Sequence, residues 1–442
     1  MTFISTRGRA PELGFDDVLL EGLARDGGLY VPKKLGELPL GQPGAYIDVA
    51  HIVTGVDRDV LTEAYSTFDH PDVCPVVQLD EYLWVQELWH GPTLAFKDVA
   101  LQLVGRLMDA ELERRGERRT IVVATSGDTG SAAIAACVGR ANLDIVVLHP
   151  AGRVSDVQRK QMTTVDEPNV HNVAIEGTFD DCQDLVKAMF ADEVFRDEMQ
   201  LGAMNSINWG RVVAQIPYYV TGHLAVDRPC TFSVPTGNFG NVLAGWYAKQ
   251  MGAPIELIIG TNTNDILARW VATGALVTGD VVPTWSPSMD IQVSSNLERL
   301  LFELLHRDGL RTAELMTRFR ELGSIEAPRD ATFLAATVDD AATLDVIRDT
   351  YERYGYLIDP HTAVGIGAAR AVGGEREPIV CLSTAHPAKF PDAVRKATGV
   401  EPEIPERLAA ALEGEEHFDA LENNLEEVKA YVSAKSSAKL RE

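Results

Sequence analysis

Two shortages in the sequence narrow what the protein can be: cysteine is scarce, and no long apolar run is present. The five cysteines among 442 residues are odd in number and scattered, with no Cys-x-x-Cys pair, so a disulfide framework is not expected. No stretch approaches the length of a membrane-spanning helix, and the first residues lack the apolar segment of a signal peptide. We therefore expect a cytoplasmic protein with no membrane partner.

Positive charge is the third shortage. Lysine and arginine total 40 against 65 aspartates and glutamates, which gives a formal net charge of −25. This balance argues against nucleic acid as a partner, and any anionic ligand has to be bound by local donors that act against the overall field. The sequence also lacks a Gly-x-Ser-x-Gly nucleophile elbow and a His-Glu-x-x-His zinc helix, so neither chemistry is indicated and no metal is expected.

What the chain does contain is a long alternation of short β-branched runs with helical patterns. This alternation is typical of parallel sheets covered by helices and predicts an α/β enzyme. The runs that we expect to form strands are 120–124, 144–148, 170–175, 231–234, 255–259 and 379–382. The length allows two or three domains, which we expect to be an N-terminal domain at 1–79, an α/β core at 80–390 and a helical C-terminal segment at 391–442.

The segment from His90 to Asp98 contains a lysine whose amine is expected to be reactive. Apolar residues recur at helical spacing from Val99 onward, so Lys97 is predicted in the first turn of a helix. The positive end of the helix disfavours an ammonium, which lowers the pKa of the lysine and frees its amine to bond a carbonyl compound. The alternative is a solvated lysine beside Asp98, an ordinary charge that complements the helix dipole.

Two glycine-rich loops, at 125–131 and 236–241, follow predicted strands and open predicted helices. Their backbone N–H groups and the helix N-termini can converge on an anion. Neither loop matches the Walker pattern or the dinucleotide fingerprint, and each could instead be a tight turn without a ligand. Two such loops together with Lys97 favour a cofactor that carries a phosphate and an aldehyde.

Two polar segments, at 152–162 and 205–211, offer further donors for anions. Arg211 can form bidentate contacts with a carboxylate or a phosphate. Other interpretations are open for single residues, because Arg159 and Lys160 could lie on a solvated helix face and Asn205 and Asn208 could cap a helix. Thr384 follows the last predicted strand, where its hydroxyl could donate to a pyridine nitrogen, and His386 is either catalytic or structural.

Taken together, these segments resemble the threonine synthases, pyridoxal-phosphate enzymes of the β-family. The resemblance extends from residues 21–32 to residues 383–390, and the segments 90–98 and 205–211 are specific to this family. Asp128 stands where the wider fold family often has asparagine, which resembles the longer bacterial and fungal branch. The implied fold is the tryptophan-synthase-β-like fold (fold type II), with large and small α/β domains, a small N-terminal domain and a helical C-terminal tail. The smaller subdomain is expected at roughly 100–200.

The resemblance also implies roles for individual residues. Lys97 would form the Schiff base with pyridoxal 5′-phosphate, Thr384 would face the pyridine nitrogen, and Asp128 would lie beside the cofactor. The cofactor phosphate would be bound by Gly237, Asn238, Phe239, Gly240 and Asn241. Ser126 and Thr129 belong to the loop that meets the substrate carboxylate. From their chemistry, the best residues to bind the substrate phosphate are Ser155, Lys160, Asn205, Asn208 and Arg211.

The implied reaction converts O-phospho-L-homoserine and water to L-threonine and phosphate by γ-elimination and β-addition of water, the last step of threonine biosynthesis. Lys97 would remove the Cα proton of the substrate. The alternatives are a threonine-synthase-like phospho-lyase or amino-acid dehydratase on the same fold, and a non-catalytic protein that binds the cofactor. The chain could act as a monomer or a homodimer, and the role of His90 is open.

Overall fold

Two sheets dominate the computed structural model, which describes residues 1–38, 44–373 and 377–438. The larger sheet has six strands in the order β14 (Phe333–Thr337), β11 (Ile255–Thr261), β10 (Cys230–Pro235), β15 (Ile379–Ser383), β5 (Leu83–Glu87) and β4 (Val76–Gln78). Neighbouring strands are parallel except for the edge strand β4.

The smaller sheet is parallel throughout. Its order is β16 (Asp419–Glu422), β8 (Val170–Glu176), β7 (Leu143–Pro150), β6 (Arg119–Ala124) and β9 (Leu201–Gly202). The central strand β7 is buried at every position, because an apolar run can be covered by helices on both faces of a parallel sheet. All six runs predicted as strands form strands of these two sheets, and the α/β prediction is confirmed.

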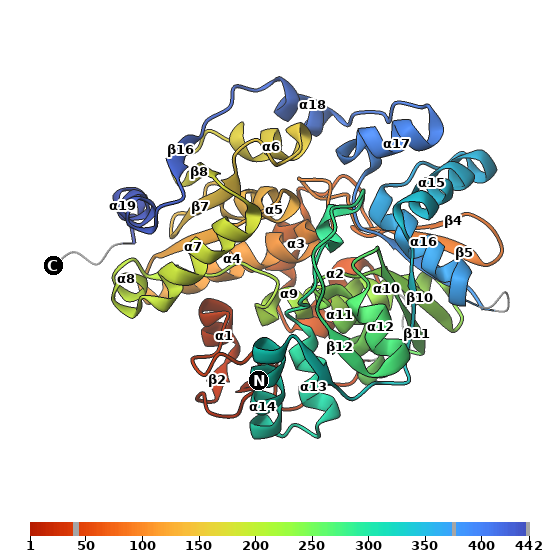
Figure 1. Cartoon of the computed structure of the whole chain (residues 1–442), viewed down its shortest axis with the longest axis horizontal. Helices are drawn as coiled ribbons and strands as arrows, with labels where there is room; N and C mark the ends of the chain where they lie inside the picture. The colour runs from red at the N-terminus through yellow and green to blue at the C-terminus, as the bar shows by residue number, and fades with distance from the viewer. Residues whose placement is uncertain (39–43, 374–376, 439–442) are drawn as a thin grey trace.

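Helices cover both sheets, and Figure 1 shows the two layered units next to each other. The smaller sheet is accompanied by α4 (Lys97–Arg115), α5 (Asp128–Cys137), α6 (Asp156–Thr163), α7 (Phe179–Ala191) and α8 (Glu193–Glu198). The larger sheet is accompanied by α10 (Ile216–Val226), α11 (Gly240–Gln250), α12 (Ile266–Thr273), α15 (Asp340–Tyr354) and α16 (Pro360–Val372). The short helix α9 (Trp209–Val213) packs against α4 and α11, between the two units.

The C-terminal segment runs back over the smaller sheet (Figure 1). After α17 (Pro391–Thr398), helix α18 (Glu406–Glu413) packs on α6 and α19 (Leu425–Lys435) packs on α7. The expectation of a purely helical segment misses strand β16, which adds to the edge of β8. This strand has mostly exposed side chains, so it forms by backbone pairing and has no apolar alternation to reveal it.

The N-terminal residues pack onto the rest of the chain. Strands β1 (Thr2–Ser5), β2 (Leu13–Gly14) and β3 (Tyr30–Pro32) form an antiparallel sheet, and α1 (Phe15–Glu21) lies between β2 and β3 in the chain. Helices α2 (Tyr46–Thr54) and α3 (Arg58–Tyr65) follow β3. Phe3 lies in the same apolar cluster as Trp209 and Val242. A buried ion pair joins Arg7 to Glu298 of α13 (Leu297–Leu304), with an Nη2 to Oε2 distance of 2.8 Å.

This ion pair predicts a measurable loss of stability. Glu298→Ala leaves the Arg7 guanidinium buried without its partner, which is expected to reduce the free energy of unfolding by about 3 kcal/mol. The matched control is Glu12→Ala, because Glu12 pairs with Lys33 at 2.6 Å with both side chains more than half exposed. That change is expected to cost less than about 1 kcal/mol. Urea unfolding of the cofactor-free protein compares them, and equal losses would contradict a special role for the buried pair.

The remaining elements lie around the carboxyl ends of the strands of the two main sheets. Helix α14 (Gly309–Leu322) and the strand pair β12 (Ala275–Val277) and β13 (Ser324–Glu326) lie beside α12 and α13, and the short 3-10 turns η1 (Pro287–Met289) and η2 (Pro387–Lys389) lie near the ends of the central strands. Helices α4, α5 and α11 begin where polar loops leave β5, β6 and β10. No helix in the described residues is long and apolar enough to cross a membrane.

Candidate active site

Lys97 is the first residue of α4, as the apolar spacing predicts, and it is only 8% exposed. The start of this helix is fixed to the end of β15, because Phe96 N donates to Thr384 O at 2.9 Å and Ala95 pairs with Ala385. The Lys97 Nζ donates to Asp128 Oδ2 at 3.2 Å. Burial lowers the pKa of Lys97 and the nearby cations Lys389 and Arg211 lower it further, while Asp128 acts in the opposite direction. The alternative of a solvated lysine is therefore wrong.

Asp98 orders the loop before the helix. It is fully buried and accepts hydrogen bonds from Thr93 N at 2.7 Å and from Thr93 Oγ1 at 2.8 Å. Burial raises the pKa of Asp98 to about 6, against the effect of the Thr93 hydrogen bonds. Asp98 is thus a structural residue of the Lys97 loop and not an exposed charge that complements the helix dipole.

Asp128, the first residue of α5, is the centre of a buried polar cluster. Its Oδ1 accepts from Gln158 Nε2 at 3.0 Å and pairs with Lys389 Nζ at 3.0 Å. Its Oδ2 accepts from Lys97 and, at 3.4 Å, from Ser288 Oγ. Burial alone would raise the pKa of Asp128, but Lys389 and Lys97 hold it well below its usual value. The group is a carboxylate with four donors around it.

Sequence reasoning assigned no role to Lys389 and Ser288, although both reach Asp128. Ser288 is held in η1 because its backbone N–H donates to His361 Nε2 at 3.2 Å, and His361 Nδ1 contacts Asp359 Oδ2 at 2.6 Å. Lys389 lies inside the segment 383–390 that carries the family resemblance, and this position was the only signal in the sequence that pointed to it. Neither contact could be read from sequence spacing, because the partners come from distant parts of the chain.

The loop 236–241 has the features of an anion site. Phe239 has a left-handed backbone (φ 65°), and Gly240 begins α11. In the described part of the chain, none of the backbone N–H groups of residues 237–241 donates to a protein acceptor. The Asn241 Nδ2 is buried and also lacks a partner there, while its Oδ1 accepts from Tyr218 and Tyr219. A phosphate matches these unused donors.

Three neighbouring residues shape this loop from outside. Ser294 Oγ donates to Gly237 O at 2.6 Å, and Asn296 N donates to Asn238 O at 3.1 Å. A side chain at Gly237 would meet Ser288 O, since a Cβ there would lie 2.9 Å from that oxygen. Glycine is thus required for close packing against η1, which places the loop beside the Asp128 cluster.

The loop 125–131 offers a second set of donors. Thr125 Oγ1 accepts from Gly127 N and Gly130 N, both at 2.9 Å, and this organises the turn into α5. Across the described residues, the N–H groups of Ser126, Asp128 and Thr129 have no protein acceptor. Ser126 is exposed and Thr129 is half-buried, so this loop can present its donors to a small anion next to Lys97.

Arg211 is the cation that stands out in the two polar segments. It is 4% exposed, and its Nε and Nη1 find no hydrogen-bond partner among the described residues. Burial lowers the pKa of Arg211 to about 10. Its helix α9 is linked to the loop 236–241, because Gln215 binds Arg211 O and Tyr218 bridges Gln215 to Asn241. An unpaired buried guanidinium is costly, so this group fits an anionic ligand.

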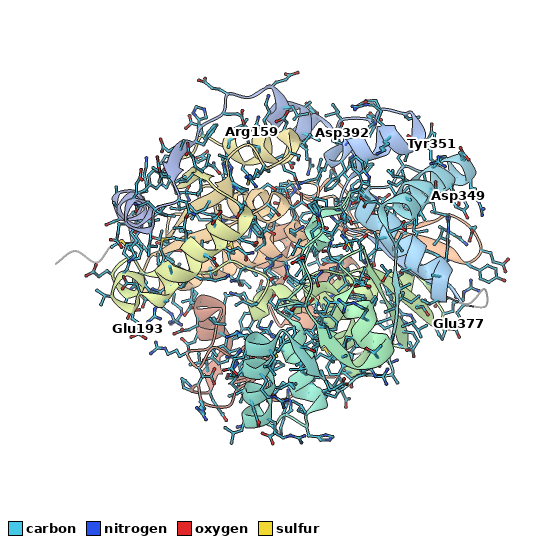
Figure 2. The ribbon with its side chains drawn as sticks, viewed as in Figure 1. Arg159, Glu193, Asp349, Tyr351, Glu377 and Asp392 are labelled. Carbon is cyan, nitrogen blue, oxygen red and sulfur yellow. The ribbon has the colours of Figure 1, made fainter. Side chains whose placement is uncertain are left out.

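The other predicted phosphate ligands already have protein partners. Asn208 caps α9 through Gly210 N and donates to Leu19 O, as the capping alternative describes. Asn205 accepts from Ile207 N, and Ser155 caps α6 through Gln158 N. Lys160 Nζ donates to Leu412 O of α18 at 2.5 Å. Arg159, labelled in Figure 2, is paired with Glu416 of the C-terminal segment at 2.8 Å and with Asp156 at 2.6 Å, so its charge is already matched by carboxylates.

Thr384 lies where the sequence predicts, directly after β15. Its carbonyl binds Phe96 N, whereas the hydroxyl of the preceding Ser383 is occupied by Trp89 Nε1 and Thr362 Oγ1. Within the described residues the Thr384 hydroxyl makes no hydrogen bond and the residue is 6% exposed, which leaves the hydroxyl available to a ligand.

The two histidines near Lys97 have structural surroundings. His90 lies between Asp69 and Glu87, with Nδ1 to Oδ1 at 2.5 Å and Nε2 to Oε2 at 2.8 Å. Burial lowers the pKa of His90, but the two carboxylates outweigh this and raise it. His386 accepts from Ala388 N, packs edge-on against Trp89, and has its pKa lowered to about 4 by burial. Both shape the turns that flank Lys97 and Thr384.

Comparison with known proteins agrees with this geometry. The family model described as pyridoxal-phosphate dependent enzyme matches residues 72–385, and those for the threonine synthase N terminus and C-terminal part match 2–44 and 362–432. A threonine synthase of Pseudomonas aeruginosa is 48% identical and is covered, like this chain, over 98% of its length.

Two solved structures are similar over nearly their whole length. The crystal structure of PLP-bound threonine synthase from Brucella melitensis has a TM-score of 0.95 and 48% identity, with 99% of this chain and 100% of that chain covered. The threonine synthase from yeast has a TM-score of 0.91 and 36% identity, with 98% of each chain covered. The fold expected from the resemblance, tryptophan-synthase-β-like with an N-terminal domain, is confirmed.

Proposed function

The chain belongs to the threonine synthase family of pyridoxal-phosphate-dependent enzymes, and from this premise we propose how its residues convert O-phospho-L-homoserine and water to L-threonine and phosphate. The observation that carries the proposal is the buried Lys97–Asp128 pair, which lies among donors that have no acceptor among the described residues. These donors are two loops of backbone N–H groups and the Arg211 guanidinium. The substrate and cofactor together bring three anionic groups, two phosphates and a carboxylate.

The residues that would hold pyridoxal phosphate fit its three polar ends. Lys97 would bond its aldehyde, residues 237–241 its phosphate, and the Thr384 hydroxyl its pyridine nitrogen. When bound, the cofactor supplies an electron sink for the charge that develops at the substrate Cα. A hydroxyl contact leaves the pyridine nitrogen uncharged, which limits that charge and disfavours side reactions such as transamination.

Once the substrate amine has displaced it from the aldehyde, Lys97 would act as the base. An amine whose pKa is lowered by burial holds fewer protons at neutral pH, so it can accept one from the substrate Cα. Asp128 keeps the lysine amine directed into the site through its 3.2 Å contact. Departure of phosphate from Cγ also requires a Cβ proton to be lost. The protonated amine can then give a proton to Cγ, and after water has added its hydroxyl at Cβ, with the water's other proton leaving on the phosphate, a second proton returns to Cα. A lysine with its ordinary, higher pKa would donate these protons less readily.

The substrate's own anions would be divided between two places. The N–H groups of Ser126, Asp128 and Thr129 suit the α-carboxylate, since they lie beside Lys97 at the start of α5. Arg211 suits the phosphate, because its two unused nitrogens can bind two phosphate oxygens. Asn205, Ser155 and Lys160 stay predictions as phosphate ligands, with Asn208 the least available because both ends of its amide are occupied.

The cellular setting is also a proposal. All five cysteines are buried and unpaired, which suits a reducing compartment such as the cytoplasm. The net charge of −25 disfavours nucleic acid, so the partners we propose are the small-molecule substrate and the cofactor.

The cofactor cradle yields a second prediction. Gly237→Ala would place a methyl group 2.9 Å from the backbone oxygen of Ser288. Overpacking of this kind costs about 1–3 kcal/mol, which corresponds to roughly tenfold weaker cofactor binding or more. Absorbance titration of the cofactor-free protein with pyridoxal phosphate measures the affinity. Gly36→Ala is the control, since among the described residues a Cβ there has one neighbour within 4 Å, at 4.0 Å. Equal affinities for the two variants would contradict the binding of the cofactor phosphate by residues 237–241.

The function itself is tested by product balance. Purified protein loaded with pyridoxal phosphate is incubated with O-phospho-L-homoserine, and phosphate and threonine are quantified together. Equal yields of the two support the proposed reaction. Phosphate accompanied by a keto acid instead of threonine would identify a phospho-lyase, and no phosphate release would identify a non-catalytic binding protein.

A further inference from the structure

Lys389 is the most deeply buried lysine near the site, and the reaction outlined above leaves it without a task. It ends η2, is 1% exposed, and donates from Nζ to Thr93 O at 2.7 Å while it pairs with Asp128 Oδ1 at 3.0 Å. An ammonium this deeply buried is costly unless it is paired. Its surroundings therefore explain how it is tolerated, but they leave open what it does for the site.

The charges around Asp128 suggest what Lys389 does. One carboxylate faces two ammonium groups, with Lys97 on Oδ2 and Lys389 on Oδ1, and its other donors, Gln158 and Ser288, are neutral. Lys97 has to lose its proton before it can bond an aldehyde or act as a base. Without Lys389, that loss would leave Asp128 as a buried carboxylate held by neutral donors alone, which is unfavourable.

We propose that Lys389 is a positioning residue that acts on Lys97 through Asp128: it is the lasting counter-ion of the carboxylate, so that Lys97 can give up its proton while Asp128 stays ionised and in place. The proposal rests on the proposed function of Lys97. The second contact of Lys389 supports it, because Thr93 O belongs to the loop that leads into Lys97. Lys389, at the end of η2, thus connects that loop to the start of α5.

The direction of each electrostatic effect agrees with this role. Burial lowers the pKa of Lys97, and among the groups that face it Lys389 and Arg211 lower it further while Asp128 raises it. Asp128 itself is faced by Lys389, Lys97 and, farther away, His361, all of which lower the pKa of the carboxyl against its burial. Removal of Lys389 leaves Lys97 as the single lysine partner of Asp128. Lys97 then holds its proton more tightly.

The test measures the Lys97 amine directly in the cofactor-free protein. Trace acetic anhydride labels free amines, and mass spectrometry of the Lys97 peptide across a pH series reports how much of the amine is unprotonated. Lys389→Met is expected to shift the labelling curve to higher pH, with about tenfold less label at a fixed pH on its rising part. Lys33→Met, which removes an exposed lysine paired with Glu12, is the control and is expected to leave the curve unchanged.

A double variant separates charge from packing. Asp128→Asn combined with Lys389→Met removes both charges with little change of shape at residue 128, and it is expected to return the Lys97 labelling to within about twofold of the parent protein. Asp128→Asn alone is expected to increase the labelling. The proposal would be overturned if Lys389→Met left the Lys97 labelling curve unchanged. It would also be overturned if the double variant labelled Lys97 no more than Lys389→Met alone does.

The same variants also show whether a loss of labelling comes from a failure to fold. If Lys389→Met does not fold, the double variant still has to fold and label normally for the proposal to stand, because it contains no unpaired carboxylate. If the double variant also fails to fold or to label normally, Lys389 has a packing role alone and the proposal is wrong. The labelling uses neither cofactor nor substrate, so it can succeed while the product-balance experiment fails, and the two claims stay distinguishable.

Discussion

Replacement of Lys97 by alanine is expected to reduce turnover of O-phospho-L-homoserine by about 10⁴-fold or more, the largest effect of any single substitution in this chain. The variant loses the amine that bonds the cofactor aldehyde and the base at the substrate Cα together. Asp128 loses one of its two cationic partners but keeps Lys389, so the fold is expected to persist.

The measurement is steady-state release of phosphate by the purified variant, alongside its absorbance spectrum with pyridoxal phosphate. The spectrum is expected to show bound cofactor without the band of a lysine–aldehyde bond. Lys33→Ala, at an exposed site, is the control and should match the parent protein. Turnover within tenfold of the parent would mean that another residue is the base.

Arg211→Met is the substitution for which we expect the second largest effect, a loss of kcat/KM. The change removes a buried cation with two unused nitrogens and keeps an unbranched apolar side chain of similar length. Loss of one partner from a buried charge pair costs about 3 kcal/mol, which corresponds to roughly a hundredfold drop in kcat/KM. Because the Arg211 Nε and Nη1 have no acceptor to lose in the part of the chain that the structure describes, the cofactor-free variant should be at least as stable as the parent.

Inorganic phosphate gives this prediction a separate readout. As a product it should inhibit the parent enzyme competitively, and Arg211→Met should weaken that inhibition together with substrate binding. Arg159→Met is the matched control, since this arginine is paired with Glu416 outside the site. A stable Arg211→Met variant with unchanged kcat/KM and unchanged phosphate inhibition would assign the substrate phosphate to other donors.

The fold was largely predictable from local sequence. Apolar runs such as 144–148 form strands because both faces of a parallel sheet are buried, and the helical spacing after Lys97 places that residue at the start of α4. Strand β16 escaped prediction because its pairing with β8 depends on backbone hydrogen bonds and leaves most of its side chains exposed.

The site was predictable in its motifs but not in its connections. Lys97 and Arg211 were singled out from local chemistry and Asp128 from the family resemblance, and the structure buries all three. The contacts of Lys389 and Ser288 with Asp128 depend on how distant segments pack, which sequence spacing does not reveal. Packing also decides the availability of the polar groups, since Asn208 and Lys160 have suitable chemistry for an anion but are bound to Leu19 and Leu412.

The central claim, that Lys97 is the residue that bonds the cofactor, is tested most directly by borohydride reduction of the loaded protein. Reduction makes a lysine–aldehyde bond permanent, and mass spectrometry of the digested protein then locates the added pyridoxyl group. We predict one modified peptide, with the group on Lys97. The same group found on Lys389, the other buried lysine at Asp128, and absent from Lys97 would contradict the account.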